Sequence, residues 1–172
     1  MKRFILAVLL VAPLLLAPMI ALAQDVDIEF DEGANFSTFK TFRIVNQTVS
    51  AKAPALNNEL VKKKIEGEIR KRLTAKGLKE VTAQQDLGVR YNLGANPRTD
   101  VTTIPAGRLG RQRRVVRDQY TEGTLIIDLR SRLDQELVWR AIVSEDEKNP
   151  AKIEGRLDEM VKKAFDKYPP KK

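Results

Sequence analysis

The chain has 172 residues and is basic: 31 Lys and Arg stand against 23 Asp and Glu, for a net charge of +8, and it contains neither Cys nor His. Without these two residue types it cannot build a Ser-His-Asp or Cys-His nucleophile system, nor a metal site of thiolates or imidazoles. Disulfides are excluded as well, so packing alone must hold the fold. The length predicts a single domain.

Residues 1–23 have the layout of a secretion signal. Lys2 and Arg3 precede an uncharged apolar run over residues 4–22, and small residues ending at Ala23 stand before a polar position. A membrane-spanning helix is the alternative, because the run reaches the roughly 18 residues such a helix needs. The two prolines within the run disfavour a continuous helix. We therefore predict cleavage after Ala23 and an exported, periplasmic or secreted protein.

The next residues predict strands. Residues 25–30 alternate polar and apolar side chains, which is typical of a half-buried strand, and the acidic side chains then face solvent. After a polar turn, residues 36–45 are aromatic and β-branched enough for a second strand, with Phe39 and Phe42 as core anchors.

The first helix is predicted after a polar connection, with Pro54 at a position where it could start and Gly77 at its end. The residues of its apolar stripe recur every three to five positions: Leu56, Leu60, Val61, Ile65, Ile69 and Leu73. The opposite face carries charges of both signs, which is typical of a solvated face.

Further strands follow. Residues 87–93 alternate again, and residues 94–110, rich in Pro and Gly, predict a long loop or a loose hairpin. Residues 115–129 and 136–143 predict a β-hairpin with its turn near Asp134, and Trp139 is expected in the core.

A second helix is predicted from Asn149-Pro150, a side-chain cap followed by a first-turn proline, to the stop at Pro169-Pro170. We therefore predict one α+β domain over residues 24–172, an antiparallel β-sheet with two amphipathic helices packed on one face.

A run of arginines is the sharpest charge feature. No acidic residue lies between positions 106 and 117, where the arginines are Arg108, Arg111, Arg113, Arg114 and Arg117. Planar guanidinium groups match phosphate or carboxylate oxygens in pairs, so this segment is a candidate anion-binding site. A solvated loop that discourages pairing at the sheet edge is the alternative. Nucleic acid is not expected as the partner, because no aromatic residue is interleaved with the arginines.

The most obvious carboxylate pair does not form a catalytic dyad. Glu122 and Asp128 share a face of one strand but would lie roughly 20 Å apart along it, beyond the ~5–9.5 Å of paired glycosidase carboxylates. The acidic residues between 25 and 32 lack the spacing of a calcium loop. We name no catalytic residue, cofactor or metal ligand.

Several segments together resemble the DUF4136 domain family. They are residues 31–42, 73–78, 120–129, 136–140 and 165–169, and the stretch Tyr120-Thr-Glu-Gly-Thr-Leu-Ile-Ile-Asp-Leu129 is the most specific. The resemblance implies an exported bacterial protein or lipoprotein of unknown function. This chain has no cysteine to accept a lipid.

Three functions remain open at this point. The first is a non-catalytic envelope module that binds an anionic surface or polymer, such as lipid or polysaccharide, or an envelope protein. The second is a carboxylate-dependent hydrolase acting on an envelope polymer, for which a pocket with two carboxylates, one of raised pKa, would be the sign. The third is a carrier of a small apolar ligand, which needs an interior cavity.

Overall fold

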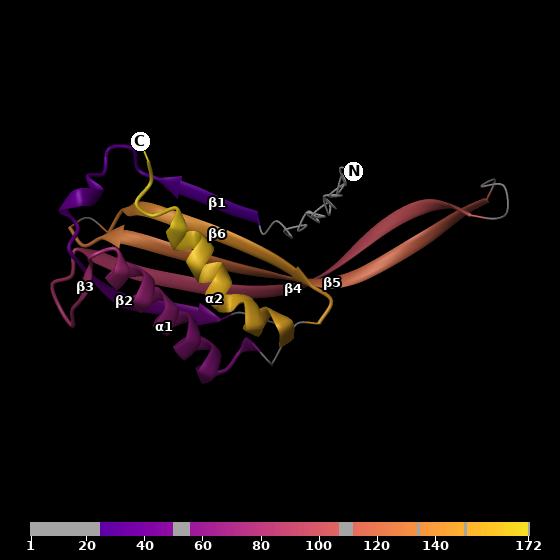
Figure 1. The fold of residues 1–172 in the computed structure, drawn as a ribbon, viewed down its shortest axis with the longest axis horizontal. Helices are drawn as coiled ribbons and strands as arrows, with labels where there is room; N and C mark the ends of the chain where they lie inside the picture. The colour runs from indigo at the N-terminus through magenta and orange to yellow at the C-terminus, as the bar shows by residue number, and fades with distance from the viewer. Residues whose placement is uncertain (1–24, 50–55, 107–111, 134, 150, 172) are drawn as a thin grey trace, which may run out of the picture.

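The computed structural model describes residues 25–49, 56–106, 112–133, 135–149 and 151–171, and it shows one β-sheet with two helices on one of its faces (Figure 1). The predicted signal segment, residues 1–23, lies outside the described residues. Among the described residues, no helix combines the length and the apolar character needed to cross a membrane.

Six strands form the sheet in the described part of the chain, in the order β1-β6-β5-β4-β2-β3. They are β1 (Asp25–Phe30), β2 (Thr41–Val49), β3 (Lys79–Glu80), β4 (Leu87–Ala106), β5 (Gln112–Ser131) and β6 (Leu137–Glu147). Neighbours run antiparallel except at β2, which is parallel to both β3 and β4. Parallel strands need a long crossover, and helix α1 (Glu59–Ala75) lies within it.

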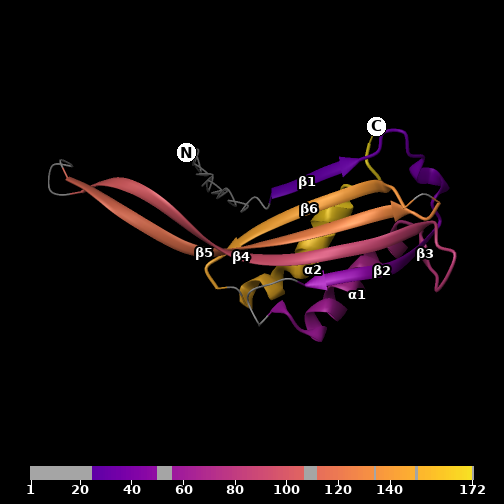
Figure 2. The same ribbon diagram turned by 180° about the vertical axis from the view of Figure 1, so that it is seen from behind.

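Both helices lie on the same face of the sheet, and the opposite face is open (Figures 1 and 2). Each buries one stripe at helical spacing: Val61, Ile65, Ile69 and Leu73 in α1, and Ile153, Leu157, Met160, Val161, Ala164 and Phe165 in α2 (Ala151–Asp166). The predicted α+β class, with two amphipathic helices on one face of the sheet, is confirmed.

Local signals at the helix ends explain where the helices begin and end. The Asn58 side chain accepts a hydrogen bond from the Val61 amide at 2.9 Å, which satisfies a free N–H of the first turn of α1. At the other end Gly77 has a φ of 87°, a left-handed conformation that glycine adopts without strain. The Asn149 side chain accepts from the Ala151 amide at 3.0 Å and starts α2, as predicted.

An aromatic cluster joins α2 to the sheet. Trp139 of β6 is fully buried and stacks on Phe165 of α2 at 5.4 Å between ring centroids, and Tyr168 meets the Trp139 ring edge-on at 5.5 Å. Such pairs stabilise a core beyond the area they bury. The predicted core position of Trp139 is confirmed, and Phe42 is also fully buried.

Two local predictions were wrong. Leu60 was expected in the buried stripe of α1, but it is 73% exposed, because the helix turns it away from the sheet side that Val61 and Ile65 occupy. The second strand was expected to begin near Phe36, but residues 36–38 form a 3-10 turn and β2 begins at Thr41. The Asn35 side chain accepts from the Ser37 amide at 3.2 Å and caps that turn.

Gly123 of β5 is a position where α2 approaches the sheet closely. A Cβ atom placed there would lie 2.8 Å from Cγ2 of Ile153 and 3.0 Å from its Cδ1. We therefore expect Gly123→Ala to lower the free energy of unfolding by about 1–3 kcal/mol, as overpacked cores do. Gly67→Ala in α1 is the control, because nothing lies within 4 Å of the added atom and alanine favours a helix by about 1 kcal/mol. Urea unfolding curves of both variants check this, and equal effects would contradict it.

Asp86 ties the start of β4 to the start of β2. Its Oδ2 accepts hydrogen bonds from the backbone amides of Lys40 (2.8 Å) and Thr41 (2.9 Å) and from the Thr41 hydroxyl (2.9 Å). The hydrogen bond from the Lys40 amide is the main reason that the pKa of Asp86 is lowered below its usual value.

A carboxylate with a lowered folded pKa stabilises the fold above its unfolded pKa of about 3.9, and this stability is lost as the pH falls through the folded value. We expect Asp86→Asn to lower the free energy of unfolding by about 1–3 kcal/mol near neutral pH. Below about pH 4 the difference in unfolding free energy between this variant and the wild type should become smaller. Urea unfolding at the two pH values measures this. A gap that does not change with pH would contradict the role of the charge.

Candidate binding surface

β4 and β5 extend far beyond the rest of the sheet as a two-stranded ribbon (Figures 1 and 2). β6 follows β5 only to the Thr121–Glu147 pair, whereas β4 and β5 stay paired out to Ala106 and Gln112. We call residues 97–106 and 112–120 the arm. Nine residues separate Thr121 from Gln112, so the arm projects about 30 Å. Of the two forms predicted for residues 94–110, the hairpin is therefore observed through Ala106.

The arm is an unusual element energetically. A two-stranded ribbon is marginally stable in water by itself, and here neither outer edge has a partner strand among the described residues. Unpaired edges present rows of backbone donors and acceptors to any strand that approaches. The arm therefore has the properties of a binding element, because it contributes little to the core but exposes many backbone hydrogen-bond donors and acceptors.

Three of the five candidate anion-binding arginines lie on the arm. Arg113, Arg114 and Arg117 belong to β5 and are exposed, whereas Arg108 and Arg111 lie outside the described residues. In the described part of the chain none of the three forms an ion pair. Strand alternation places Arg113 and Arg117 on one face and Arg114 on the other.

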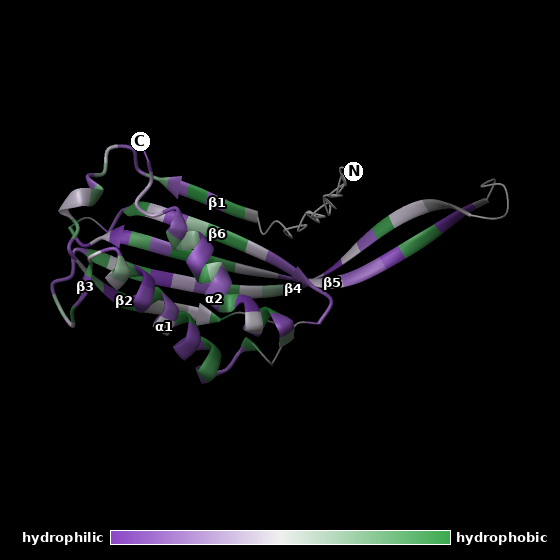
Figure 3. Ribbon diagram, viewed as in Figure 1, coloured by the Kyte–Doolittle hydropathy of each residue, from purple (hydrophilic) through white to green (hydrophobic). Residues whose placement is uncertain are grey.

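Apolar side chains accompany these charges. Val101 is 62% exposed and Val115 is 51% exposed, and both lie on the arm face that carries Arg113 and Arg117. Figure 3 shows a hydrophobic stretch of β5 within the hydrophilic part of the arm. An exposed face with both valines and guanidinium groups can bury apolar area and pair charge at the same time.

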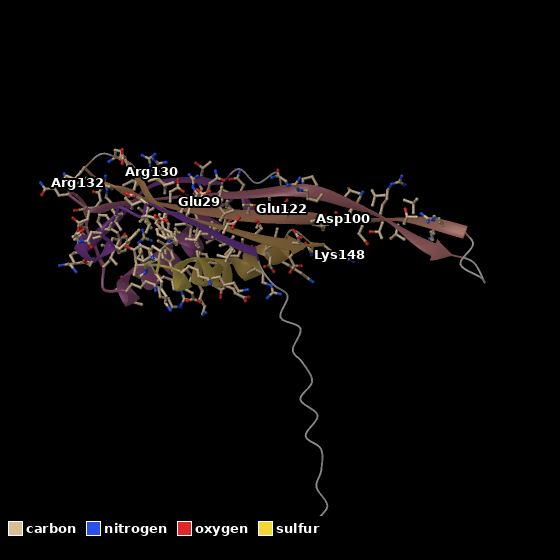
Figure 4. All side chains as sticks on the ribbon, turned by 90° about the horizontal axis from the view of Figure 1, so that it is seen from above. Glu29, Asp100, Glu122, Arg130, Arg132 and Lys148 are labelled. Carbon is tan, nitrogen blue, oxygen red and sulfur yellow. The ribbon has the colours of Figure 1, made fainter. Side chains whose placement is uncertain are left out.

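The base of the arm is acidic. Asp100 and Asp118 stand directly opposite each other across β4 and β5, and Glu122 stands opposite Asp146 across β5 and β6 (Figure 4 labels Asp100 and Glu122). Partial desolvation and the nearby Glu122 and Asp100 carboxylates raise the pKa of Asp146, although this residue is exposed. Arg98 hydrogen-bonds Glu122, and this bond raises the pKa of the guanidinium.

This acidic group lacks the geometry of a hydrolase site. Asp146 is exposed, and Glu122 is engaged by Arg98. A groove of about 290 Å³ lies nearby, but its walls are Pro97, Arg98, Thr99, Gln119, Tyr120, Thr121 and Lys148, without either carboxylate. In the described part of the chain no cluster of acidic side chains is arranged to hold a metal ion. A general acid needs a protected carboxyl next to its substrate.

A row of alternating charges crosses the open face of the sheet. It runs through Arg90 of β4, Asp128 of β5, Arg140 of β6 and Glu29 of β1, each directly opposite the next. Arg140 holds the Asp128 carboxylate with two hydrogen bonds, Nε to Oδ1 at 2.7 Å and Nη2 to Oδ2 at 2.9 Å. It also lies 3.7 Å from Glu29.

The strand pattern predicted that Asp128 shares a face with Glu122, but it did not predict this row. Two-residue periodicity shows which side chains share a face, whereas the row depends on the pairing register of four strands. Arg130 also lies 3.7 Å from the Asp128 carboxylate, so one acid faces two arginines.

Removal of the Asp128 charge should therefore destabilise the fold through repulsion. The Asp128 side chain is only 13% exposed, and it is the carboxylate that lies between Arg130 and Arg140. Without it, the positive charges of these two arginines repel each other. We expect Asp128→Ala to lower the free energy of unfolding by about 1–3 kcal/mol and to regain part of that in high salt, which screens like charges. Thermal melting at low and high salt measures both effects. A loss that does not respond to salt would show that packing, and not charge, is responsible.

Comparisons with solved structures show the fold alone. A PDZ domain protein from Parabacteroides distasonis has 16% sequence identity and a TM-score of 0.59, and the alignment covers 86% of this chain but only 36% of that one. The chain thus spans about a third of that protein's length.

Two further solved structures align over most of both chains, with lower scores. The PelC dodecamer from Paraburkholderia phytofirmans has 10% identity and a TM-score of 0.49, with 83% of this chain and 95% of that one covered. A putative neuraminyllactose-binding hemagglutinin homolog from Helicobacter pylori has 10% identity and a TM-score of 0.47, with 77% and 87% covered.

No curated protein matches the chain. The family described as Domain of unknown function (DUF4136) matches residues 26–170, which is nearly all of the described fold and includes both strands of the arm. The chain belongs to the DUF4136 family.

Proposed function

We propose that this protein is a non-catalytic binding module of the cell envelope whose arm attaches it to a surface that carries negative charge. The observation that carries the proposal is the arm itself: a two-stranded ribbon about 30 Å long with three exposed arginines that have no ion-pair partner among the described residues. Guanidinium groups along a projecting element reach a large partner without steric conflict with the domain.

The exported location rests on the signal-like sequence of residues 1–23. After export the available anionic surfaces include lipid headgroups and polysaccharides. Guanidinium groups bind phosphate and carboxylate oxygens in pairs, so either chemistry suits the arm.

The two alternatives have less support. A hydrolase needs carboxylates that face a common substrate pocket, and the groove at the base of the arm is not lined by Glu122 or Asp146. A carrier needs space between helices and sheet, where the fully buried side chains of Trp139, Phe165 and Ile65 instead fill the interior.

Substitution of the arm arginines tests the proposal. We expect the triple variant Arg113→Ser, Arg114→Ser, Arg117→Ser to bind anionic lipid vesicles about 100-fold more weakly than the wild type, since each basic residue near such a surface contributes about 1 kcal/mol. Binding of the wild type should also fall steeply with salt. Vesicle co-sedimentation with phosphatidylglycerol-containing and neutral vesicles, and with lipopolysaccharide, measures these affinities.

The matched control removes the same charge elsewhere. Lys63, Lys76 and Lys79 are exposed and lie on α1, its C-cap and β3, away from the arm. Their triple substitution by serine lowers the net charge equally but should change binding less than threefold, well within about 1 kcal/mol. Equal losses in both triple variants would show that only net charge matters and would overturn the role of the arm.

A further inference from the structure

β1 is an outer strand of the sheet with an acidic face. It pairs with β6 on one side, and no strand pairs with its other edge among the described residues. Its sequence, Asp-Val-Asp-Ile-Glu-Phe, contains three acids and no base. Asp27 and Glu29 are exposed on the open face of the sheet, whereas Val26 and Ile28 pack toward the core. This edge therefore offers unpaired backbone groups beside a row of carboxylates.

The outer part of β5 has the complementary pattern. Arg113, Val115 and Arg117 occupy every second position on one face of the strand. Arg113 and Arg117 are four residues apart, whereas Asp27 and Glu29 are two residues apart. A strand laid antiparallel along β1 with Arg113 directly opposite Glu29 has Val115 opposite Asp27. Arg117 is then diagonally across from Asp27, which is still within reach of a long side chain. Opposite charges directly across a strand pair stabilise it, and like charges destabilise it.

The arm of the same chain cannot make this contact. The first residue of β1, Asp25, pairs with Ser144, and Ser144 pairs with Thr124 of β5. Arg117 lies seven residues farther out along β5 than Thr124, which is about 23 Å beyond the end of β1. The arm also points away from β1 (Figures 1 and 2). The complementary surfaces can therefore meet only between two molecules.

We propose that the free edge of β1 is the docking site for the arm of a second copy of this protein. The inference rests on the proposed function and names the anionic surface that the arm binds. Backbone hydrogen bonds between β5 of one copy and β1 of the other supply affinity. The register is set by Arg113 directly opposite Glu29 and by Arg117 diagonally across from Asp27.

Docking also stabilises the arm and pairs the open edge of β1. The arm becomes part of a larger sheet and loses the marginal stability of a two-stranded ribbon. The edge of β1 becomes paired, so it no longer offers a template for uncontrolled association. The exposed Val115 lies between the two arginines on the same face and is covered by the same contact.

A charge-swap experiment tests the inference. The arm variant Arg113→Glu, Arg117→Glu has an acidic arm and an acidic β1. The edge variant Asp27→Lys, Glu29→Lys has a basic arm and a basic β1. In the wild type each arm meets an opposite charge, whereas each variant alone opposes like charges. In a mixture of the two variants, every arm again meets an opposite charge on the other variant.

The readout is sedimentation velocity of the mature chain over a range of concentrations. We expect the wild type to self-associate, each variant alone to lose at least about tenfold in affinity, and the equimolar mixture to regain the association. Far-UV circular dichroism and thermal melting verify that each variant is folded. Since Glu29 also lies 3.7 Å from Arg140, the single variant Asp27→Lys serves as a milder edge variant in the same mixture.

Two results would overturn the inference: a wild type that stays monomeric at all concentrations, or variants that do not recover association when mixed. The proposed function fails separately. If the arm variant loses vesicle binding while the wild type stays monomeric, the arm binds an anionic surface of another kind. If association follows the swap but no vesicle binds, the acidic partner is the second copy and a lipid surface is excluded.

Discussion

The antiparallel ladder between β4 and β5 is the constraint on which the rest of the structure depends. The two strands pair without interruption from Leu87–Ser131 to Ala106–Gln112. The inner half buries Leu87, Val89, Leu125 and Ile127 beneath the helices. The outer half has no further strand beside it among the described residues, yet it continues the same register. The buried half of the ladder therefore sets the direction of the exposed arm, because both halves belong to the same pair of strands.

The sequence predicted most of this domain because alternation and helical periodicity report burial directly. Such local patterns predicted both helices, the strands over residues 25–30 and 87–93, and the hairpin with its turn near Asp134. The sequence did not distinguish a loop from a hairpin in residues 94–110, because prolines and glycines there are typical of loops. Pro97 and Pro105 nevertheless lie in β4, in the part that pairs with β5 on one side only among the described residues, and prolines within sheets are found on such edge strands.

The functional surfaces were less predictable for a different reason. The arginines of residues 108–117 were recognised as a charge run, but whether they stayed in a loop or stood on a projecting ribbon depended on β-strand register. The row from Arg90 to Glu29 and the free edge of β1 depend on strand order, which places β1 beside β6, the first and the last strand among the described residues. No local pattern encodes that neighbour relationship, since it arises from the packing of the whole sheet.

The arm arginines and the acids of β1 thus carry opposite signs, and the distance between them matters more than the net charge. On the open face of the sheet, acidic and basic side chains pair with one another: Arg140 binds Asp128 and also approaches Glu29. The arm arginines have no such partner among the described residues and stand about 23 Å or more beyond the end of β1 along the sheet. At physiological ionic strength charges so far apart are screened from one another. A contact between them must therefore be made locally, where a second copy brings its arm to β1. Arg113 opposite Glu29, with Arg117 diagonally across from Asp27, gives that contact a register.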